Sequence, residues 1–417
     1  MNPPNTLTFK LKQHTPLIHF QPDQDGATLR ASEVKPKLDK YLLGIVFEND
    51  FDRAKKYFIG YNSESEGSLK SKFEKGFTGF DYKLSLHIEA NSIKIESIPE
   101  KFPCFFGNMG DENIANPKKF SFADRTIKLV CKTNHQLLHD ELKKEVPNFF
   151  ARNNFGNRQS KGFGSFFIDE NDEKFQLPGL YSYFQYNTSS TQLSTISGKH
   201  KSVFGEIDMV HRAFRSGIND IGPGQVNLFY MKPLIWQYFK QRGIVWEKKR
   251  IKEVFFNTRL KEQITRRENE LTDSESAEDW PLFYKSKKYG IIKDLLGVSS
   301  LEKWRVPYNS TITKKSATVE RMKSPLFYKP IVVNGEGRVY IDFDDIPKGF
   351  LDSEFLISTN SDNFTLKTVD EFDIDYFFEW CLKKADIKAL IDRRFRDTKK
   401  AKHILKLFGQ LRTNINY

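Results

Sequence analysis

The residues best suited to chemistry in this sequence lie in a glycine-rich stretch, NFGNRQSKGFGSF, which runs from Asn154 to Phe166. Glycine adopts backbone angles that are closed to other residues and lets a ligand approach the main chain closely. Main-chain N–H groups that converge in such a turn bind anions, and Arg158 and Lys161 add two positive charges at the same place. The pattern indicates a phosphate site with Phe155 or Phe163 available for stacking, or else an ordinary turn with solvated cations.

A second set of basic residues lies between a predicted strand and a predicted helix near the beginning of the chain. Its members are His14, His19, Arg30, Lys35, Lys37 and Lys40. A fold that brings this segment and the glycine-rich stretch to the same side of a sheet would create one basic cleft. The alternative is a solvated helix face that carries lysines.

Two later segments combine cations with features of a helix end or a strand. Arg212 and Arg215 share one face of a helix and suit bidentate phosphate binding, but they also suit a helix C-terminus that ends at Gly217. The segment from Arg321 to Pro330 alternates cations with aromatic residues. That alternation fits a single strand of RNA or an edge strand with outward lysines.

The sequence predicts neither a metal nor a cofactor. His135 and His139 have the i, i+4 spacing of a zinc site, but no third ligand accompanies them and the segment reads HQLLH rather than HExxH. The sequence contains no serine–histidine–acid motif, P-loop or dinucleotide fingerprint.

Composition favours an intracellular protein with a polyanionic partner. The 417 residues suggest two domains, and 66 Lys and Arg against 54 Asp and Glu give a net charge of +12. An excess of cations favours nucleic acid, whose phosphates supply most of the non-specific affinity. Three scattered cysteines form no disulfide framework, which fits a reducing cytoplasm. No secretion signal or membrane-spanning run is visible, so we expect no membrane partner.

The hydrophobic pattern of the first part predicts the elements that position these residues. We expect a strand over 7–17, a helix over 32–47, a hairpin over 79–98, a strand over 127–131, a helix over 135–149 and a strand over 163–168. This order matches a βαββαβ ferredoxin-like unit with an insertion. It places the glycine-rich loop between the second helix and the last strand.

A second region is predicted to begin at residue 178. We expect a strand over 181–186, helices over 204–214, 226–239 and 246–256, and a hairpin from 319 to 343 that turns at Asn334-Gly335. The acidic segment 266–279 reads as an exposed loop, and two helices end the chain after residue 370. The domains are therefore predicted at 1–177 and 178–417, with a helical insertion over about 201–300.

Three of these segments together resemble the RAMP superfamily of CRISPR-associated proteins. They are TPL at 15–17 with LRASEVKPKL at 29–38, RQSKGFGSF at 158–166, and RMKSPLFYKPI at 321–331. The length and the order of the motifs are most similar to the first subunit of the Cmr (type III-B) effector complex. The stretch LDKY at 38–41 departs from the arginine and tryptophan cluster that the family often carries in its first helix.

The resemblance implies an α+β fold with two ferredoxin-like, RNA-recognition-type units. It implies a non-catalytic subunit that binds guide RNA near its 3′ end, with target RNA and other RAMP subunits as further partners. Carried over by motif, the RNA-binding residues are Arg30, Lys35, Lys37, Arg158, Ser160, Lys161, Gly162, Phe163, Gly164, Arg321, Lys323 and Lys329.

The resemblance also leaves an enzyme as the alternative. Relatives in the superfamily cleave CRISPR repeat RNA without a metal, using a general base near the first helix. In this sequence His14 or His19 would take that role, with Lys37 or Arg158 stabilising the phosphorane.

Overall fold

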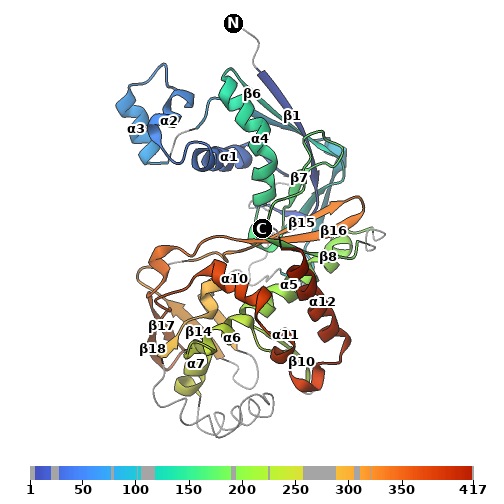
Figure 1. The fold of residues 1–417 in the computed structure, drawn as a ribbon, viewed down its shortest axis with the longest axis vertical. Coiled ribbons are helices and arrows are strands. Elements are labelled where there is room, and N and C mark those ends of the chain that lie inside the picture. Colours follow the sequence, from blue (N-terminus) through green and yellow to red (C-terminus); the bar gives the residue numbers. More distant parts are fainter. Residues whose placement is uncertain are drawn as a thin grey trace.

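The computed structural model describes residues 5–19, 28–76, 79–100, 102–104, 118–188, 194–223, 226–256, 288–304, 310–319 and 321–415. Within these ranges the chain has a mixed α/β fold with several antiparallel sheets (Figure 1). None of the helices in the described ranges is both long enough and apolar enough to cross a bilayer. We call residues 5–168 the N-terminal region and residues 182–415 the C-terminal region.

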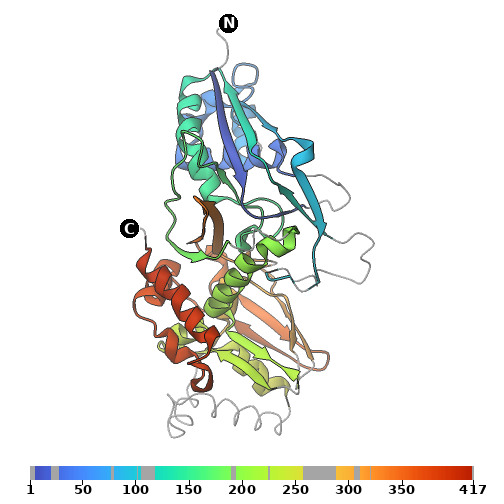
Figure 2. The ribbon, with the colours of Figure 1, turned by 90° about the vertical axis from the view of Figure 1, so that its right-hand side faces the viewer.

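A four-stranded antiparallel sheet organises the N-terminal region. Its strands are β1 (Asn5–Gln13), β3 (Lys83–His87), β6 (Ile127–Thr133) and β7 (Phe166–Ile168), in the order β3-β6-β1-β7. The alternating residues Leu7, Phe9 and Leu11 are buried, as their period of two predicts. Helices α1 (Ala31–Ile45) and α4 (Gln136–Arg152) pack on this inner face, as Figures 1 and 2 show. The predictions of the first strand and both helices are confirmed.

The predicted hairpin over 79–98 is wrong. β3 pairs with β6, whereas β4 (Ile93–Ser97) pairs with β5 (Lys119–Ala123), which in turn pairs with β2 (Leu17–Ile18) in a separate sheet. The 3₁₀ turn η2 (Ala90–Ser92) separates β3 from β4, so the two strands diverge to partners that lie far away in sequence. A small lobe with α2 (Phe51–Ala54), η1 (Lys55–Tyr57) and α3 (Glu66–Glu74) follows α1.

A three-stranded sheet forms the centre of the C-terminal region. The strands β8 (Ser182–Tyr186), β15 (Leu326–Val333) and β16 (Glu336–Phe343) lie in the order β15-β16-β8. The turn between β15 and β16 is at Asn334 (φ 49°) and Gly335 (φ 77°), as the Asn-Gly dipeptide predicts. Helices α5 (Ile196–Arg215) and α12 (Lys399–Thr413) pack against β8.

The predicted helical insertion over about 201–300 is only partly helical. Besides α5, α6 (Leu234–Lys240) and α7 (Glu247–Phe255), the described part of this stretch contains four short strands. These strands are β9 (Ile218–Ile221), β10 (Asn227–Met231), β11 (Ile244–Trp246) and β12 (Lys288–Gly290). The predicted helix over 226–239 begins as β10, because this stretch pairs with β9 and a helix forms only after Pro233. The acidic segment 266–279 lies outside the described residues.

The rest of the C-terminal region is a four-stranded sheet and a group of helices. The sheet order is β13-β14-β17-β18, and η6 (Lys293–Leu296) precedes it. The strands are β13 (Leu301–Trp304), β14 (Ser310–Lys315), β17 (Glu354–Ser358) and β18 (Asn363–Lys367), with η7 (Lys348–Phe350) before β17. α10 (Ile374–Lys383), α11 (Ile387–Leu390) and η8 (Arg393–Phe395) lead to α12. The two longer helices of this group confirm the prediction for the end of the chain.

Candidate functional site

The glycine-rich loop lies between the two regions and joins them. It leaves α4, makes the 3₁₀ turn η3 (Gln159–Lys161) against β15, and enters β7. The hydroxyl of Thr15 donates a hydrogen bond to the Gly162 carbonyl (2.6 Å) and accepts one from the Ser165 N–H (2.9 Å). The Ser165 hydroxyl donates to the Pro330 carbonyl on β15 (2.7 Å). Both flanks of the loop are therefore fixed by the fold.

Most main-chain amides of the loop are already hydrogen-bonded within the protein. The Gly156 N–H donates to the Glu33 carboxylate (2.8 Å), and the Gly164 N–H donates to the Pro16 carbonyl (2.8 Å). The other amides with protein acceptors belong to Phe155, Asn157, Lys161, Gly162 and Ser165. The predicted nest of amides for phosphate is therefore wrong for these donors, because they have no hydrogen left to offer.

Close packing explains the glycines. Gly156, Gly162 and Gly164 have φ angles of 74°, 84° and 64°, which favour glycine over residues with a side chain. A Cβ atom on Gly162 would lie 2.9 Å from Pro330 and 3.0 Å from Ile207. Gly162 thus lets the loop fit against the C-terminal region, whereas Gly156 and Gly164 let it pack on Leu17, Ile18 and Phe155 of the N-terminal region.

The loop aromatics are not available for base stacking. Phe155 and Phe163 are both fully buried. The Phe163 ring stacks on Phe204 of α5 with the ring centroids 3.9 Å apart. The expectation that Phe155 or Phe163 stacks on a base is therefore wrong, because both rings form part of the core.

Lys161 meets a histidine of the C-terminal region. Its Nζ lies 2.9 Å from Nδ1 of His211 on α5, and within the described ranges Lys161 forms no ion pair with a carboxylate. Burial, with smaller contributions from nearby Arg215 and Arg158, lowers the pKa of Lys161 to about 7. Burial also lowers the pKa of His211 well below its usual value, so the neutral imidazole accepts from Lys161.

Arg158 immediately precedes η3 and has a strained backbone. Its φ of 59° lies in the left-handed region, which costs a residue with a side chain about 1–2 kcal/mol. Strain of this kind concentrates at functional sites. The side chains of Arg158 and Ser160 are half-buried, and burial lowers the pKa of Arg158.

Lys37 of the N-terminal region lies beside the loop, and Lys323 of the C-terminal region is a second cation of the motif segments. Lys37 Nζ donates to Oε1 of Gln159 (2.8 Å) and lies 3.3 Å from the Asn154 carbonyl. Burial lowers the pKa of Lys37, Glu33 at 3.6 Å opposes this shift, and the positive charge of Lys323 lowers the pKa slightly further. Lys323 is exposed and pairs with Asp344 (2.6 Å).

Arg30 and Arg321 also lie at the surface. Arg30 is the residue before α1 and is half-exposed, and Arg321 is exposed. Lys35, in contrast, points into the N-terminal region, where its Nζ contacts the Asp39 carboxylate (2.8 Å) and the Phe80 carbonyl (3.0 Å).

Lys329 holds the two regions together from within. It is fully buried in β15, and its Nζ donates to the Asn153 carbonyl (2.8 Å), Asn154 Oδ1 (3.1 Å) and the Phe166 carbonyl (2.8 Å). The expectation that Lys329 contacts RNA is corrected, because its ammonium group already donates to three acceptors of the N-terminal region.

The two histidines of the enzyme alternative differ in exposure. His14 is buried, and its Nδ1 accepts a hydrogen bond from the Val332 N–H (3.0 Å). Burial also lowers the pKa of His14 well below its usual value. Because Val332 occupies the Nδ1 lone pair and the side chain is buried, His14 is not placed to take a proton from a substrate. His19 lies half-exposed at the end of the described N-terminal segment.

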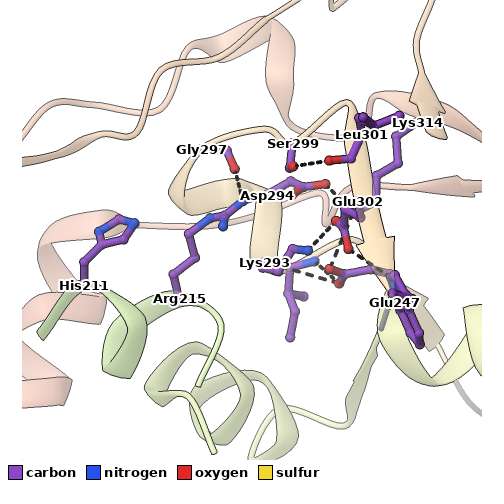
Figure 3. Close-up of polar contacts among 12 residues, drawn as sticks. His211, Arg215, Glu247, Lys293, Asp294, Gly297, Ser299, Leu301, Glu302 and Lys314 are labelled. Atoms are coloured by element: carbon purple, nitrogen blue, oxygen red, sulfur yellow. Dashed lines mark hydrogen bonds and ion pairs between the residues drawn. The ribbon is translucent and has the colours of Figure 1, made fainter. Parts of the chain in front are cut away.

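The arginines on α5 have structural partners, and Figure 3 shows those of Arg215. Arg215 donates to the Gly297 carbonyl (2.7 Å) and lies 3.5 Å from Asp294, which pairs with the buried Lys314 (2.7 Å). Lys314 also lies 2.8 Å from Glu302. This buried ionic network was missed in the sequence because its members come from separate elements.

Arg212 pairs with Asp208 (3.5 Å) and Asp220 (3.6 Å). Gly217 follows α5 with a φ of 75°, and its N–H donates to the Arg212 carbonyl (2.8 Å). The helix-end interpretation of Arg212 and Gly217 thus agrees with the structure.

Comparison with known proteins assigns the chain to a family. The model of the Cmr1 N-terminal domain matches residues 4–218, and that of the Cmr1 C-terminal domain matches residues 230–403. No curated protein matches by sequence. A crystal structure of apo Cmr1 from Pyrococcus furiosus is similar at 12% identity over 82% of this chain and 90% of that one, with a TM-score of 0.29.

A cryo-EM structure of a type III-B Cmr-β complex bound to cognate target RNA also contains a similar chain. That chain is 12% identical, and the match covers 40% of this chain and 60% of that one, with a TM-score of 0.28. The two family models cover most of the sequence between them, and the first alone spans more than half of it. The protein therefore belongs to the Cmr1 family.

Proposed function

We propose that this chain is an RNA-binding subunit of a type III-B CRISPR effector complex and holds guide RNA near its 3′ end through phosphate contacts. Membership of the Cmr1 family supports the place in the complex. The net charge of +12 supports a polyanionic partner. Target RNA and other RAMP subunits are the remaining partners in this proposal.

The observation that carries the proposal is the position of Lys37, whose Nζ contacts Gln159 in the glycine-rich loop (2.8 Å), together with the exposed Lys323 on the segment that leads into β15. Arg30 and Arg321 extend this set of surface cations on the same two segments. Because most loop amides are occupied, we assign phosphate binding to side-chain cations and assign the glycines to packing. Arg158 and Ser160 are half-buried at the edge of this surface, where a phosphate can still reach them.

We further propose that both regions are ferredoxin-like, with a boundary between residues 177 and 178. The strand order β3-β6-β1-β7, with α1 and α4 on one face, supports this for the N-terminal region. β8, α5, β15 and β16 fit the first part of a second unit, and α12 packs along β8 where a fourth strand would pair. The family models divide the chain later, between residues 218 and 230. We keep the earlier boundary because β8 pairs with β16.

The test is the salt dependence of RNA binding by Lys37→Ala/Lys323→Ala. Each lost phosphate contact on a single strand reduces the slope of log K against log salt by about 0.7, so the double variant should lose about 1.4. Its affinity should fall about tenfold at low salt, which corresponds to about 1.4 kcal/mol. Fluorescence anisotropy with single-stranded RNA measures both quantities.

The matched control is Lys70→Ala/Lys75→Ala. Both lysines are exposed on or next to α3 and form no ion pair within the described ranges. Equal slopes for the two double variants would overturn the site.

A photoreactive uridine near the guide 3′ end tests the finer assignment: it should crosslink to residues 28–40 or 321–323, and crosslinking only from the 5′ end would contradict it.

A further inference from the structure

The outer face of the N-terminal sheet carries a group of lysines that the loop site does not include. α1 and α4 cover the inner face, and Figure 2 looks onto β1 and β6 from the uncovered side. Lys10, Lys83, Lys128 and Lys132 point outward and are exposed. We call these four residues the sheet-face lysines.

The strand register fixes these lysines in like-charged pairs. Lys10 on β1 lies directly opposite Lys128 on β6, and Lys83 on β3 lies directly opposite Lys132 on β6. Directly opposed side chains have Cβ atoms about 4.5–5.5 Å apart, and like charges at that distance destabilise a sheet. His87 on β3 lies on the other side of Lys128.

Nothing within the described part of the chain compensates this charge. The side chains of the sheet-face lysines form no ion pair or hydrogen bond there. The outward positions of β1, β3 and β6 contain no carboxylate: besides the four lysines they are Thr6, Thr8, Lys12, Ser85, His87 and Val130. Two carboxylates do lie beside β1: Glu170 lies 3.5 Å from Lys12, and the Asp172 carboxylate accepts a hydrogen bond from the main-chain N–H of Lys10 (2.6 Å).

An ordinary solvated face does not explain the arrangement. Lysines often protect the edge strand of a sheet from pairing with another chain, and this accounts for Lys83 on the edge strand β3. β6, however, is paired on both sides at Lys128 and Lys132, where no edge needs protection, although β1 pairs with β7 only over Leu11–Gln13. A solvated face would also mix both signs of charge, since acidic residues are nearly as numerous as basic ones in this chain.

We propose that the sheet-face lysines form a second RNA-binding surface, which contacts the phosphates of a single strand without reading its sequence. The inference deepens the proposed function and rests on it. The two lysine pairs lie four residues apart along the strands, about 13 Å, so they span several phosphates. No Phe, Tyr or Trp occupies an outward position on β1, β3 or β6, and His87 is the one imidazole there, so the surface lacks the row of large aromatic rings on which successive bases stack.

The same chemistry favours RNA over an acidic protein. Protein interfaces have an apolar centre with aromatic residues and are depleted of lysine. The one apolar side chain among the outward positions, Val130, is itself buried. A row of flexible ammonium groups instead suits a phosphodiester backbone, whose counterions are released on binding.

The test uses Lys128→Glu/Lys132→Glu in the full chain. Each new carboxylate would face Lys10 or Lys83, and opposite charges in a cross-strand pair are favourable. The variant should therefore keep or raise the wild-type melting temperature while losing RNA affinity. We expect at least a tenfold weaker binding of long polyuridine at low salt and a salt slope smaller by about 1.4.

The control is Lys70→Glu/Lys75→Glu, which makes the same change in net charge at α3. Figure 1 places α3 on the opposite side of the N-terminal region from β1. We expect the control to bind polyuridine with nearly the wild-type slope. Equal losses in the two variants would reduce the effect to net charge and overturn the proposal.

Failure of this inference and failure of the proposed function give different results. If the wild-type chain binds no RNA, both the proposed function and this inference are wrong. A wild-type chain that binds RNA, with binding lost in Lys37→Ala/Lys323→Ala but kept in Lys128→Glu/Lys132→Glu, would overturn the sheet face alone. If Lys128→Glu/Lys132→Glu kept RNA binding but stopped co-purifying with a subunit of the complex, the sheet-face lysines would bind an acidic protein instead of RNA.

Discussion

Individual cations of similar appearance in the sequence have different environments in the fold. Lys37 and Lys323 reach the surface, Lys35 and Lys329 donate to internal acceptors, and Lys161 contacts a neutral histidine. Residue type and spacing predicted that these positions carry charge. They did not predict burial, because each buried lysine contacts a segment far away in the sequence: Phe80 for Lys35, α5 for Lys161 and the N-terminal region for Lys329.

Lys161 predicts a specific pH dependence of stability. Its pKa is about 7 in the folded protein and near 10.5 in the unfolded chain. Between these values the unfolded state binds more protons, so stability rises with pH across this window. Below the window the cost of burying the charged ammonium group is fully present and does not change with pH. Lys161→Met removes this dependence. The free energy of unfolding, measured in urea, should therefore increase in the wild type relative to the variant as the pH rises from about 7.

The comparison with Lys75→Met provides the control. Lys75 is exposed, so this substitution should leave the pH profile unchanged. Parallel profiles for the wild type and Lys161→Met would show that the Lys161 ammonium group is not disfavoured by folding.

Elements whose pattern is short-range were predictable, and those that depend on distant partners were not. The period of two in β1, the helical spacing of α4 and the Asn334-Gly335 turn are each visible within a few residues. The relationship between β3 and β4 is not, because each strand pairs with a different segment beyond residue 118. The glycine-rich loop was predicted in place, but its role in joining the two regions depends on contacts with β15.

Gly162→Ala tests that role of the loop. A φ of 84° lies in the left-handed region, where alanine is less stable by about 1–2 kcal/mol. The Cβ of alanine would also press on Pro330 and Ile207. Overpacking of this kind costs about 1–3 kcal/mol more. Denaturant unfolding measures the loss.

Gly335→Ala is the matched control. Gly335 has a φ of 77°, and a Cβ there meets no atom within 4 Å. Gly335→Ala should therefore be destabilised only by the left-handed backbone conformation, without the overpacking. If both substitutions destabilise the protein equally, the loop is not tightly packed between the two regions.

At the scale of the whole molecule, the cores of the two regions interlock. Phe163 of the loop joins the core cluster of the C-terminal region, whereas Ile331, Val333 and Tyr340 join that of the N-terminal region. Lys329 and the His14–Val332 hydrogen bond cross the same boundary. Interdomain contacts are usually smaller and more polar, so this exchange of core residues indicates that neither region remains folded when the other unfolds.

The tryptophans allow a direct test of this coupling, because all of them follow residue 230. They are Trp236, Trp246, Trp280, Trp304 and Trp380. Leu142 on α4 is fully buried in the core cluster of the N-terminal region, and Leu142→Ala should cost about 2–5 kcal/mol. If the two regions unfold together, this substitution should move the tryptophan fluorescence transition to lower denaturant, even though no tryptophan lies in the N-terminal region.

Lys143→Ala, one residue along the same helix and exposed, should leave the transition in place. A tryptophan transition that stays fixed while circular dichroism reports an earlier loss of structure in Leu142→Ala would show that the regions unfold separately, and the interlocked core would then contribute little to their association.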